Sequence, residues 1–235
     1  NTNSHDNKSA QLKVEVVHFV NSLGVPLKGI LTYPIDYDST KKYPMVVHIY
    51  QIQSNLSSNY VAGVGSRNGF NKRLLIEHGY FVYQPDVDID QRGTGVAALD
   101  CVNASIDALN NHKGIDLTKM GLTGHSFGGY GTNFIATQSN RFAAYVSGAS
   151  IANIVQHYFS YNKHFEIFDY GRYEDGQFDM NVPFAENPEK YFKNNPINFV
   201  QNVSAPMLLW TGSKDGNVVP SQTDAFYTGL LRNKK

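Results

Sequence analysis

The first part of the chain has the pattern of hydrophobic and polar positions that is typical of a β-hairpin. Charged and apolar residues alternate from Lys13 to Val16, and a second, largely apolar run covers residues 25–33. The segment 21–24, which ends in glycine, separates the two runs. Alternation with a period of two on either side of such a turn predicts an antiparallel β-hairpin.

After this hairpin, short apolar runs alternate with amphipathic segments. The apolar runs predict strands at residues 44–50, 79–85, 119–124, 143–148 and 206–211. Apolar positions at helical spacing predict helices around residues 74–76 and at 99–109, 130–137 and 221–231. Apolar strands that are separated by helices form a doubly wound, mostly parallel sheet. The predicted fold class is therefore α/β, with an antiparallel N-terminal hairpin.

Residues 158–199 break the alternation of strands and helices. The segment has no clean period, and aromatic side chains crowd it at Phe159, Tyr161, Phe165, Phe168, Tyr170, Tyr173, Phe178, Phe184, Tyr191 and Phe192. A long irregular excursion from an α/β domain is typical of a lid or a wall of an active site. A packed surface subdomain without substrate contact is the alternative prediction.

A G-x-S-x-G motif carries the first candidate for chemistry. Residues 124–128 read Gly-His-Ser-Phe-Gly and stand between a predicted strand and a predicted helix. In the α/β-hydrolase fold such a sharp strand-to-helix turn exposes the serine as a nucleophile at the helix N-terminus. Ser126 is the candidate nucleophile, and the backbone N–H of Phe127 is the candidate oxyanion donor. The alternative is an ordinary Gly/Ser turn.

A serine hydroxyl needs a histidine base that a carboxylate orients, and in this fold the chain order is Ser, Asp, His. Asp215 follows the late predicted strand 206–211 and is the candidate acid. All eight histidines precede it, at His5, His18, His48, His78, His112, His125, His157 and His164. We therefore expect the catalytic histidine, together with the final strand and helix of the fold, to lie beyond residue 235, and residues 1–235 alone to be inactive.

Three of these histidines are candidates for a replacement base. His125 neighbours Ser126 at a strand end, where successive side chains point to opposite faces. His157 and His164 lie in the aromatic excursion, from which they would approach the site in an unusual chain order.

From about Lys13 to its end, the chain resembles the catalytic domain of the prolyl oligopeptidase family of serine peptidases, which includes dipeptidyl and acylaminoacyl peptidases. The likeness rests on residues 124–130 (Gly-His-Ser-Phe-Gly-Gly-Tyr), on Asn-Arg-Phe-Ala-Ala at 140–144, and on residues 206–220 around Asp215. The family usually carries an N-terminal β-propeller, which the resemblance implies for the full-length protein.

The resemblance also implies roles for single residues. Tyr50 takes the place of a tyrosine whose hydroxyl donates to the oxyanion, with a strand-end core aromatic as the alternative. Asn217 takes the place of a side chain that holds a substrate carbonyl. The pocket for the residue before the scissile bond is lined at the positions of Phe127, Ile151, Ile154, Tyr161 and Val218.

Composition and charge narrow the classes of partner. The 235 residues are 41% hydrophobic and 17% charged, which suits one globular domain. Twenty basic and twenty acidic side chains cancel, so nothing points to nucleic acid or to an anionic membrane. No apolar run reaches the ~20 residues of a membrane span. Residues 1–10 form a polar leader without signal-peptide character.

Cys101 is the only cysteine, so an internal disulfide is impossible. It falls within the predicted helix 99–109, where a small buried side chain is favoured over a catalytic thiol. The compartment stays open, with a periplasmic or secreted location favoured over the cytoplasm.

The sequence thus predicts a serine peptidase that cleaves peptides through an acyl-enzyme, with no metal or organic cofactor. A carboxylesterase of the same fold and a non-catalytic, hydrolase-like binding domain are the alternatives. A homo-oligomer joined at an exposed sheet edge is a further expectation.

Overall fold

The computed structural model describes residues 12–56 and 69–235 of the chain. The predicted polar leader, residues 1–10, lies outside these described residues. Every strand and helix named below belongs to the described part of the chain.

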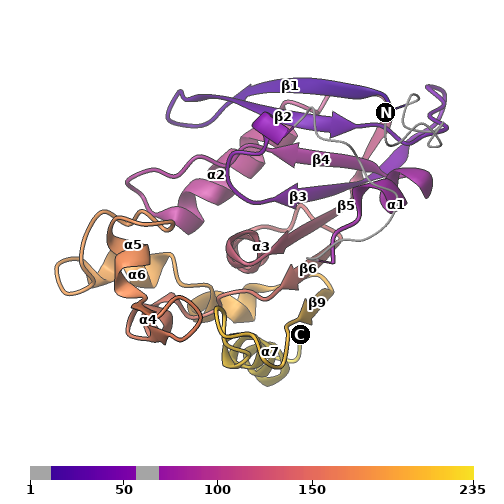
Figure 1. The fold of residues 1–235 in the computed structure, drawn as a ribbon. Coiled ribbons are helices and arrows are strands. Elements are labelled where there is room, and N and C mark those ends of the chain that lie inside the picture. The colour runs from indigo at the N-terminus through magenta and orange to yellow at the C-terminus, as the bar shows by residue number, and fades with distance from the viewer. Residues whose placement is uncertain (1–11, 57–68) are drawn as a thin grey trace, which may run out of the picture.

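One seven-stranded sheet organises the molecule (Figure 1). Its spatial order is β1 (Val14–Val20), β2 (Pro26–Thr32), β4 (Phe81–Pro85), β3 (Tyr43–Ile49), β5 (Ile115–His125), β6 (Ala144–Gly148) and β9 (Met207–Trp210). The strands from β4 to β9 in this order are parallel, whereas β1 and β2 run antiparallel to their neighbours. The predicted α/β class, with a mostly parallel sheet and an antiparallel N-terminal hairpin, is confirmed.

The hairpin turn forms because Asn21 and Gly24 supply what it needs. The Asn21 side-chain oxygen accepts hydrogen bonds from the backbone N–H groups of Leu23 and Val25, both at 3.0 Å. Gly24 has φ +81°, a conformation that side chains disfavour. The register of β1 on β2 follows from this turn and pairs Val20 with Pro26.

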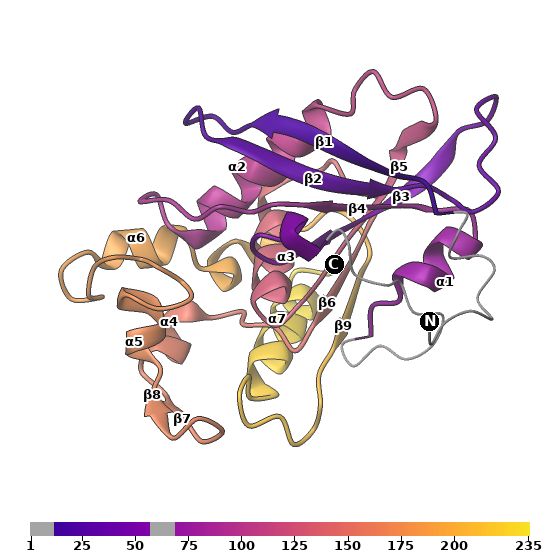
Figure 2. The same ribbon diagram turned by 45° about the horizontal axis from the view of Figure 1, so that its top comes forward.

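Helices cover both faces of the sheet (Figure 2). The short helix α1 (Lys72–Glu77) lies on one face, and α2 (Thr94–Asp107), α3 (Phe127–Gln138) and α7 (Ser221–Arg232) lie on the other. On α2, Cys101 is fully buried, and burial raises the pKa of its thiol to about 11. A thiol with so high a pKa stays protonated near neutral pH, so Cys101 fills the core and is no nucleophile.

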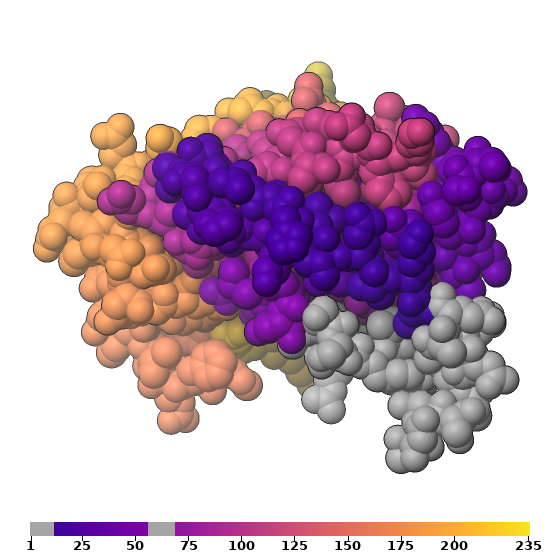
Figure 3. Space-filling model, turned by 90° about the horizontal axis from the view of Figure 1, so that it is seen from above, coloured from indigo at the N-terminus to yellow at the C-terminus, as the bar shows by residue number. Residues whose placement is uncertain are grey.

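The aromatic excursion folds into a lobe at one end of the sheet (Figure 1), and its atoms form the orange part at the left of Figure 3. Its elements are α4 (Ile154–Tyr158), β7 (Tyr161–Asn162), β8 (Ile167–Phe168), α5 (Tyr170–Glu174), α6 (Pro188–Lys193) and the 3₁₀ helix η3 (Pro196–Asn202). Another short 3₁₀ helix, η2 (Ser54–Leu56), follows β3. The buried rings of the lobe form a second core of their own, with Tyr173 and Phe178 stacked at 4.4 Å.

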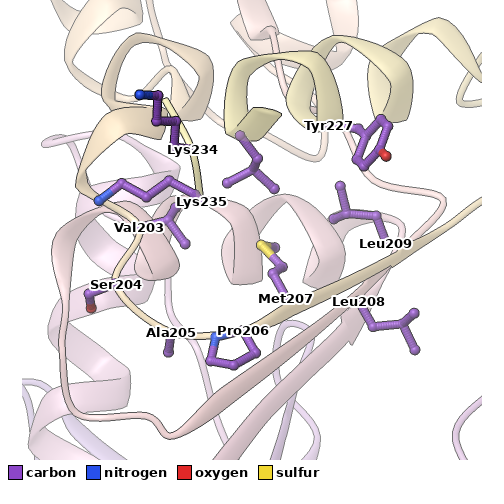
Figure 4. A pocket seen from close by; sticks show the side chains of 11 residues that line it. Val203, Ser204, Ala205, Pro206, Met207, Leu208, Leu209, Tyr227, Lys234 and Lys235 are labelled. Carbon is purple, nitrogen blue, oxygen red and sulfur yellow. The ribbon is translucent and has the colours of Figure 1, made fainter. Parts of the chain in front are cut away.

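At the far edge of the sheet, β9 leaves an apolar hollow of about 670 Å³ (Figure 4). Met207 and Leu209 point toward α7, whereas Leu208 points away and is 61% exposed. Residues 203–206, at the amino end of β9, line much of the hollow. The hollow therefore lies away from the carboxyl ends of the strands, where doubly wound sheets bind their ligands.

Among the described helices, none combines the length and the apolar character that crossing a membrane requires.

Candidate functional site

Ser126 lies in a strained turn at the carboxyl end of the central strand β5. The turn connects β5, which ends at His125, directly to α3, which begins at Phe127. Ser126 has φ 58° and ψ −118°, a conformation that non-glycine residues rarely adopt. Its N–H donates to the Gly148 carbonyl at 2.8 Å, which ties the turn to the end of β6. Strain of this kind, held by surrounding hydrogen bonds, is typical of a nucleophile elbow.

Two glycines make the tight turn sterically possible. A Cβ on Gly124 would lie 2.1 Å from the Gly128 carbonyl oxygen, and a Cβ on Gly128 would lie 2.1 Å from the Ile49 carbonyl oxygen. Both contacts are with backbone atoms, which a change of side-chain rotamer cannot relieve. The missing side chain of Gly128 lets the start of α3 approach the end of β3, where Tyr50 follows.

The two residues that carry the predicted oxyanion donors, Tyr50 and Phe127, are in contact through their rings. The rings of Tyr50 and Phe127 meet edge to face with 5.7 Å between centroids. Phe127 is the first residue of α3, so no carbonyl within the helix accepts its backbone N–H. Gln177 of the lobe donates to the Tyr50 hydroxyl oxygen at 3.2 Å. Because Gln177 supplies the proton of that bond, the hydroxyl proton of Tyr50 remains available to another acceptor.

Asp86 fixes the loop that carries Tyr50. Its carboxylate, 4% exposed at the end of β4, accepts from the backbone N–H groups of Gln53 and Ser54 and from the Ser54 hydroxyl, at 2.6–2.8 Å. These bonds hold the chain just after β3, so the position of Tyr50 depends on a charged side chain of the neighbouring strand.

Asp215 lies in the loop after β9, at the carboxyl ends of the parallel strands, where Ser126 also lies. Its Oδ1 accepts from the backbone N–H groups of Asn217 and Val218, at 2.9 and 3.0 Å. This side-chain turn fixes the carboxylate, and within the described residues no donor is bonded to Oδ2. The loop thus presents one free carboxylate oxygen.

His125 lies within reach of the charge of Asp215 but is engaged elsewhere. In the sheet register His125 is opposite Gly148, which is opposite Trp210. Because Gly148 has no side chain, the His125 and Trp210 rings stack across it at 5.4 Å. Burial lowers the pKa of His125, and the charge of Asp215 partly opposes that shift.

The two lobe histidines occupy different environments. His157 is buried, its Nδ1 lies 3.0 Å from the Tyr173 hydroxyl, and burial lowers its pKa to about 4. His164 is exposed, and its Cβ lies 3.7 Å from the place where a Gly216 Cβ would stand. In the described part of the chain, no histidine is hydrogen-bonded to Ser126 or to Asp215.

The structure gathers four of the five predicted pocket residues. Phe127, Ile151, Ile154 and Val218 belong to the second core, which the lobe shares with the start of α3 and the loop after β9. Tyr161 lies apart on β7, half exposed, with its ring edge to face against Phe168. The lobe is therefore a packed unit whose core includes four of the predicted pocket residues.

Asn217, the predicted carbonyl-binding residue, contacts the lobe directly. Its side-chain oxygen accepts from Asn162 Nδ2 and from a guanidinium nitrogen of Arg172, each at 3.0 Å. Sequence reasoning did not single out Asn162, Arg172 or Gln177. They lie in segments without periodicity, and their partners are 45 to 127 residues away.

Comparison with known proteins points to one family of peptidases. The family model of the prolyl oligopeptidase family matches residues 73–235. An uncharacterized peptidase of Bacillus subtilis, YuxL, is 25% identical over 227 residues, which are 94% of this chain and 33% of that protein. Dipeptidyl-peptidase 5 of Porphyromonas gingivalis is 24% identical over 213 residues, 83% of this chain and 29% of that protein.

Solved structures show the same fold. The acylaminoacyl peptidase of Pyrococcus horikoshii superposes with a TM-score of 0.74 at 23% identity, over 96% of this chain and 36% of that one. Dipeptidyl peptidase 4 of Porphyromonas gingivalis gives a TM-score of 0.70 at 20% identity, over 95% and 30% of the two chains. The chain spans about a third of the length of the relatives that it matches. With a family match over most of its residues, and with the α/β-hydrolase frame that those peptidases share, the chain belongs to the prolyl oligopeptidase family.

Proposed function

We propose that this chain carries the nucleophile, the acid and the oxyanion donors of a serine peptidase that cleaves peptide bonds through an acyl-enzyme. The observation that carries the proposal is Ser126 at φ 58° in the turn between β5 and α3, followed by Phe127, whose ring contacts that of Tyr50. The family membership and the peptidase names of the relatives support the same reaction class.

The first half of the reaction follows from this arrangement. The Ser126 hydroxyl attacks the substrate carbonyl carbon while its proton passes to a base. The Phe127 N–H and the Tyr50 hydroxyl donate to the oxyanion that forms, and the N-terminus of α3 favours its negative charge. When the tetrahedral intermediate collapses, the C–N bond breaks, the amine leaves with that proton, and an ester at Ser126 remains.

We infer that the base is a histidine that these 235 residues do not include. The free Oδ2 of Asp215 is the acceptor that would hold the Nδ1–H of this histidine. This bond fixes the histidine tautomer that accepts the serine proton. The same base then activates the water that hydrolyses the ester. The family resemblance and the greater length of the relatives also support an N-terminal β-propeller in the full-length protein.

The site at which a fluorophosphonate reacts tests this proposal. The full-length protein is incubated with the probe, and the modified peptide is identified by mass spectrometry. We expect modification at Ser126 and a parallel loss of hydrolysis of a peptidyl p-nitroanilide. A protein that stays unmodified at Ser126 while it cleaves the peptide contradicts the assignment, and one that hydrolyses esters but no peptide favours an esterase.

Replacing Tyr50 with phenylalanine is expected to lower kcat for the same substrate by about 10²–10³-fold, because one oxyanion donor is lost. The ring contact with Phe127 is kept, so KM should change little. Steady-state kinetics of the full-length protein measure the effect. Tyr227→Phe, which removes a hydroxyl from an exposed ring of α7, is the matched control. Equal kcat values for the two variants argue against a role for the Tyr50 hydroxyl.

A further inference from the structure

The Asn217 side chain is oriented by donors that contact only one end of its amide. Asn162 Nδ2 and the Arg172 guanidinium both donate to Oδ1, at 3.0 Å each. An arginine has no acceptor, so the amide must present its oxygen to the lobe. The Asn217 Nδ2 group then points away from these donors, and it has no acceptor among the described residues.

Asn162 is itself fixed in the orientation that this contact requires. Its Oδ1 accepts from the backbone N–H groups of His164 and Phe165, at 3.0 and 3.1 Å, in the turn between β7 and β8. Its Nδ2 therefore faces Asn217 and Asp169, and lies within hydrogen-bond distance of the Asn217 carbonyl oxygen and of Asp169 Oδ1, each at 3.3 Å. Asn162 is 2% exposed, so water has little access to these bonds.

The charge of Arg172 is balanced inside the same network. Asp169, 1% exposed, accepts from Arg172 at 3.2 Å, and Ser160 donates to its other oxygen at 2.9 Å. From α4, His157 faces that oxygen with Nε2 at 3.6 Å, and burial keeps this histidine neutral near neutral pH because it lowers the pKa to about 4. The guanidinium is thus a fixed, paired donor, and its charge polarises the Asn217 amide so that Nδ2 donates more strongly.

We propose that Arg172 and Asn162 are positioning residues, which hold the Asn217 amide with Nδ2 turned toward the substrate. The inference rests on the proposed function, in which Asn217 binds a substrate carbonyl. An amide held this way presents only N–H donors to the substrate. It therefore binds a hydrogen-bond acceptor, such as the main-chain carbonyl of the residue that precedes the acyl residue. The flipped amide presents an oxygen to that carbonyl and repels it. The network therefore selects peptides with at least two residues before the scissile bond over simple acyl esters.

A double-mutant cycle with two substrates tests the proposal. The full-length protein and its variants Arg172→Met, Asn217→Ala and the pair are assayed on a dipeptidyl p-nitroanilide and on p-nitrophenyl butyrate, which lacks the second carbonyl. We expect Arg172→Met to lower the ratio of kcat/KM for peptide over ester by about tenfold, mainly through KM of the peptide. The pair should have the ratio of Asn217→Ala alone, because Arg172 acts through Asn217.

Controls keep an effect on folding apart from an effect on the amide. Arg141→Met removes an arginine that is likewise paired with an aspartate, Asp107, at the far end of α3, and should leave the ratio as in the wild type. Arg172→Lys keeps a cation beside Asp169 and should recover part of the ratio. If Arg172→Met does not fold, Asn162→Ser carries the same test, since serine suits this turn and leaves no unpaired charge.

If the effects of Arg172→Met and Asn217→Ala on the ratio multiply in the double variant, the positioning role is overturned. An equal loss of kcat/KM on peptide and ester overturns it as well. A wild-type protein that hydrolyses the ester but not the peptide instead refutes the proposed peptidase function.

Discussion

In the full-length protein, Ser126→Ala is expected to lower kcat for a peptidyl p-nitroanilide on the order of a millionfold, because the acyl-enzyme can no longer form. The binding groups around it remain, so KM should stay within a few-fold of the wild-type value. Alanine carries the same Cβ as serine in the φ 58° turn, and the backbone strain is therefore unchanged. The thermal unfolding temperature should match the wild type, and the kinetic loss then reports chemistry alone.

A serine outside the site provides the comparison for this prediction. Ser204 is exposed and lies near the amino end of β9, beside the hollow of Figure 4. Ser204→Ala should keep the wild-type kcat. Peptide turnover by the Ser126→Ala protein at a rate near that of the Ser204→Ala protein is incompatible with Ser126 as the nucleophile.

Hydrophobic pattern was enough to predict the sheet and its connections. The buried strand β3 reads as a continuous apolar run, because both of its faces are largely covered. In β5 only the second half was predicted, because Asp116, Thr118 and Lys119 interrupt the apolar pattern in its first half. The hairpin followed from an alternation and a turn that are local in sequence. The strand–motif–helix context around Ser126 is local as well, and the structure places that residue in a strained turn at the end of β5.

The lobe was beyond such reasoning because its order comes from contacts that are distant in sequence. The helices α4 and α5 have five residues each, too few to show a helical period. Their rings are held by a core that includes Phe127 and Val218 from opposite sides of the lobe sequence. In the same way, Asn162 meets Asn217 across 55 residues, and Gln177 meets Tyr50 across 127. A pattern read along the chain carries no signal for such pairs.

The lobe also explains why the candidate site is more than an elbow and an acid. Gln177 orients the Tyr50 hydroxyl from one end of the lobe, and Asn162 and Arg172 orient Asn217 from the other. Each of these side chains donates to the oxygen of its partner. The Tyr50 hydroxyl proton and the Asn217 Nδ2 group therefore stay free to donate. The lobe therefore sets the hydrogen-bond polarity of groups that the sheet and its loops supply.

Asp215→Asn is expected to lower kcat on the order of ten-thousandfold in the full-length protein. The asparagine oxygen still accepts from the backbone N–H groups of Asn217 and Val218, as Oδ1 does now at 2.9 and 3.0 Å. Its NH₂ group then replaces the free Oδ2 and donates to the histidine base instead of accepting from it. This bond stabilises the wrong tautomer of the base, which can no longer take the proton of Ser126.

The matched control for Asp215 is an aspartate in the same kind of turn, away from the site. Asp38 Oδ1 accepts from the Thr40 N–H at 2.9 Å, in the loop before β3. Steady-state kinetics should show a wild-type kcat for Asp38→Asn and a small change in KM for Asp215→Asn. A loss of less than tenfold in Asp215→Asn would mean that another carboxylate orients the base. A matching loss in Asp38→Asn would trace the effect to loop stability, because both turns depend on the same kind of hydrogen bond from a backbone N–H to an aspartate oxygen.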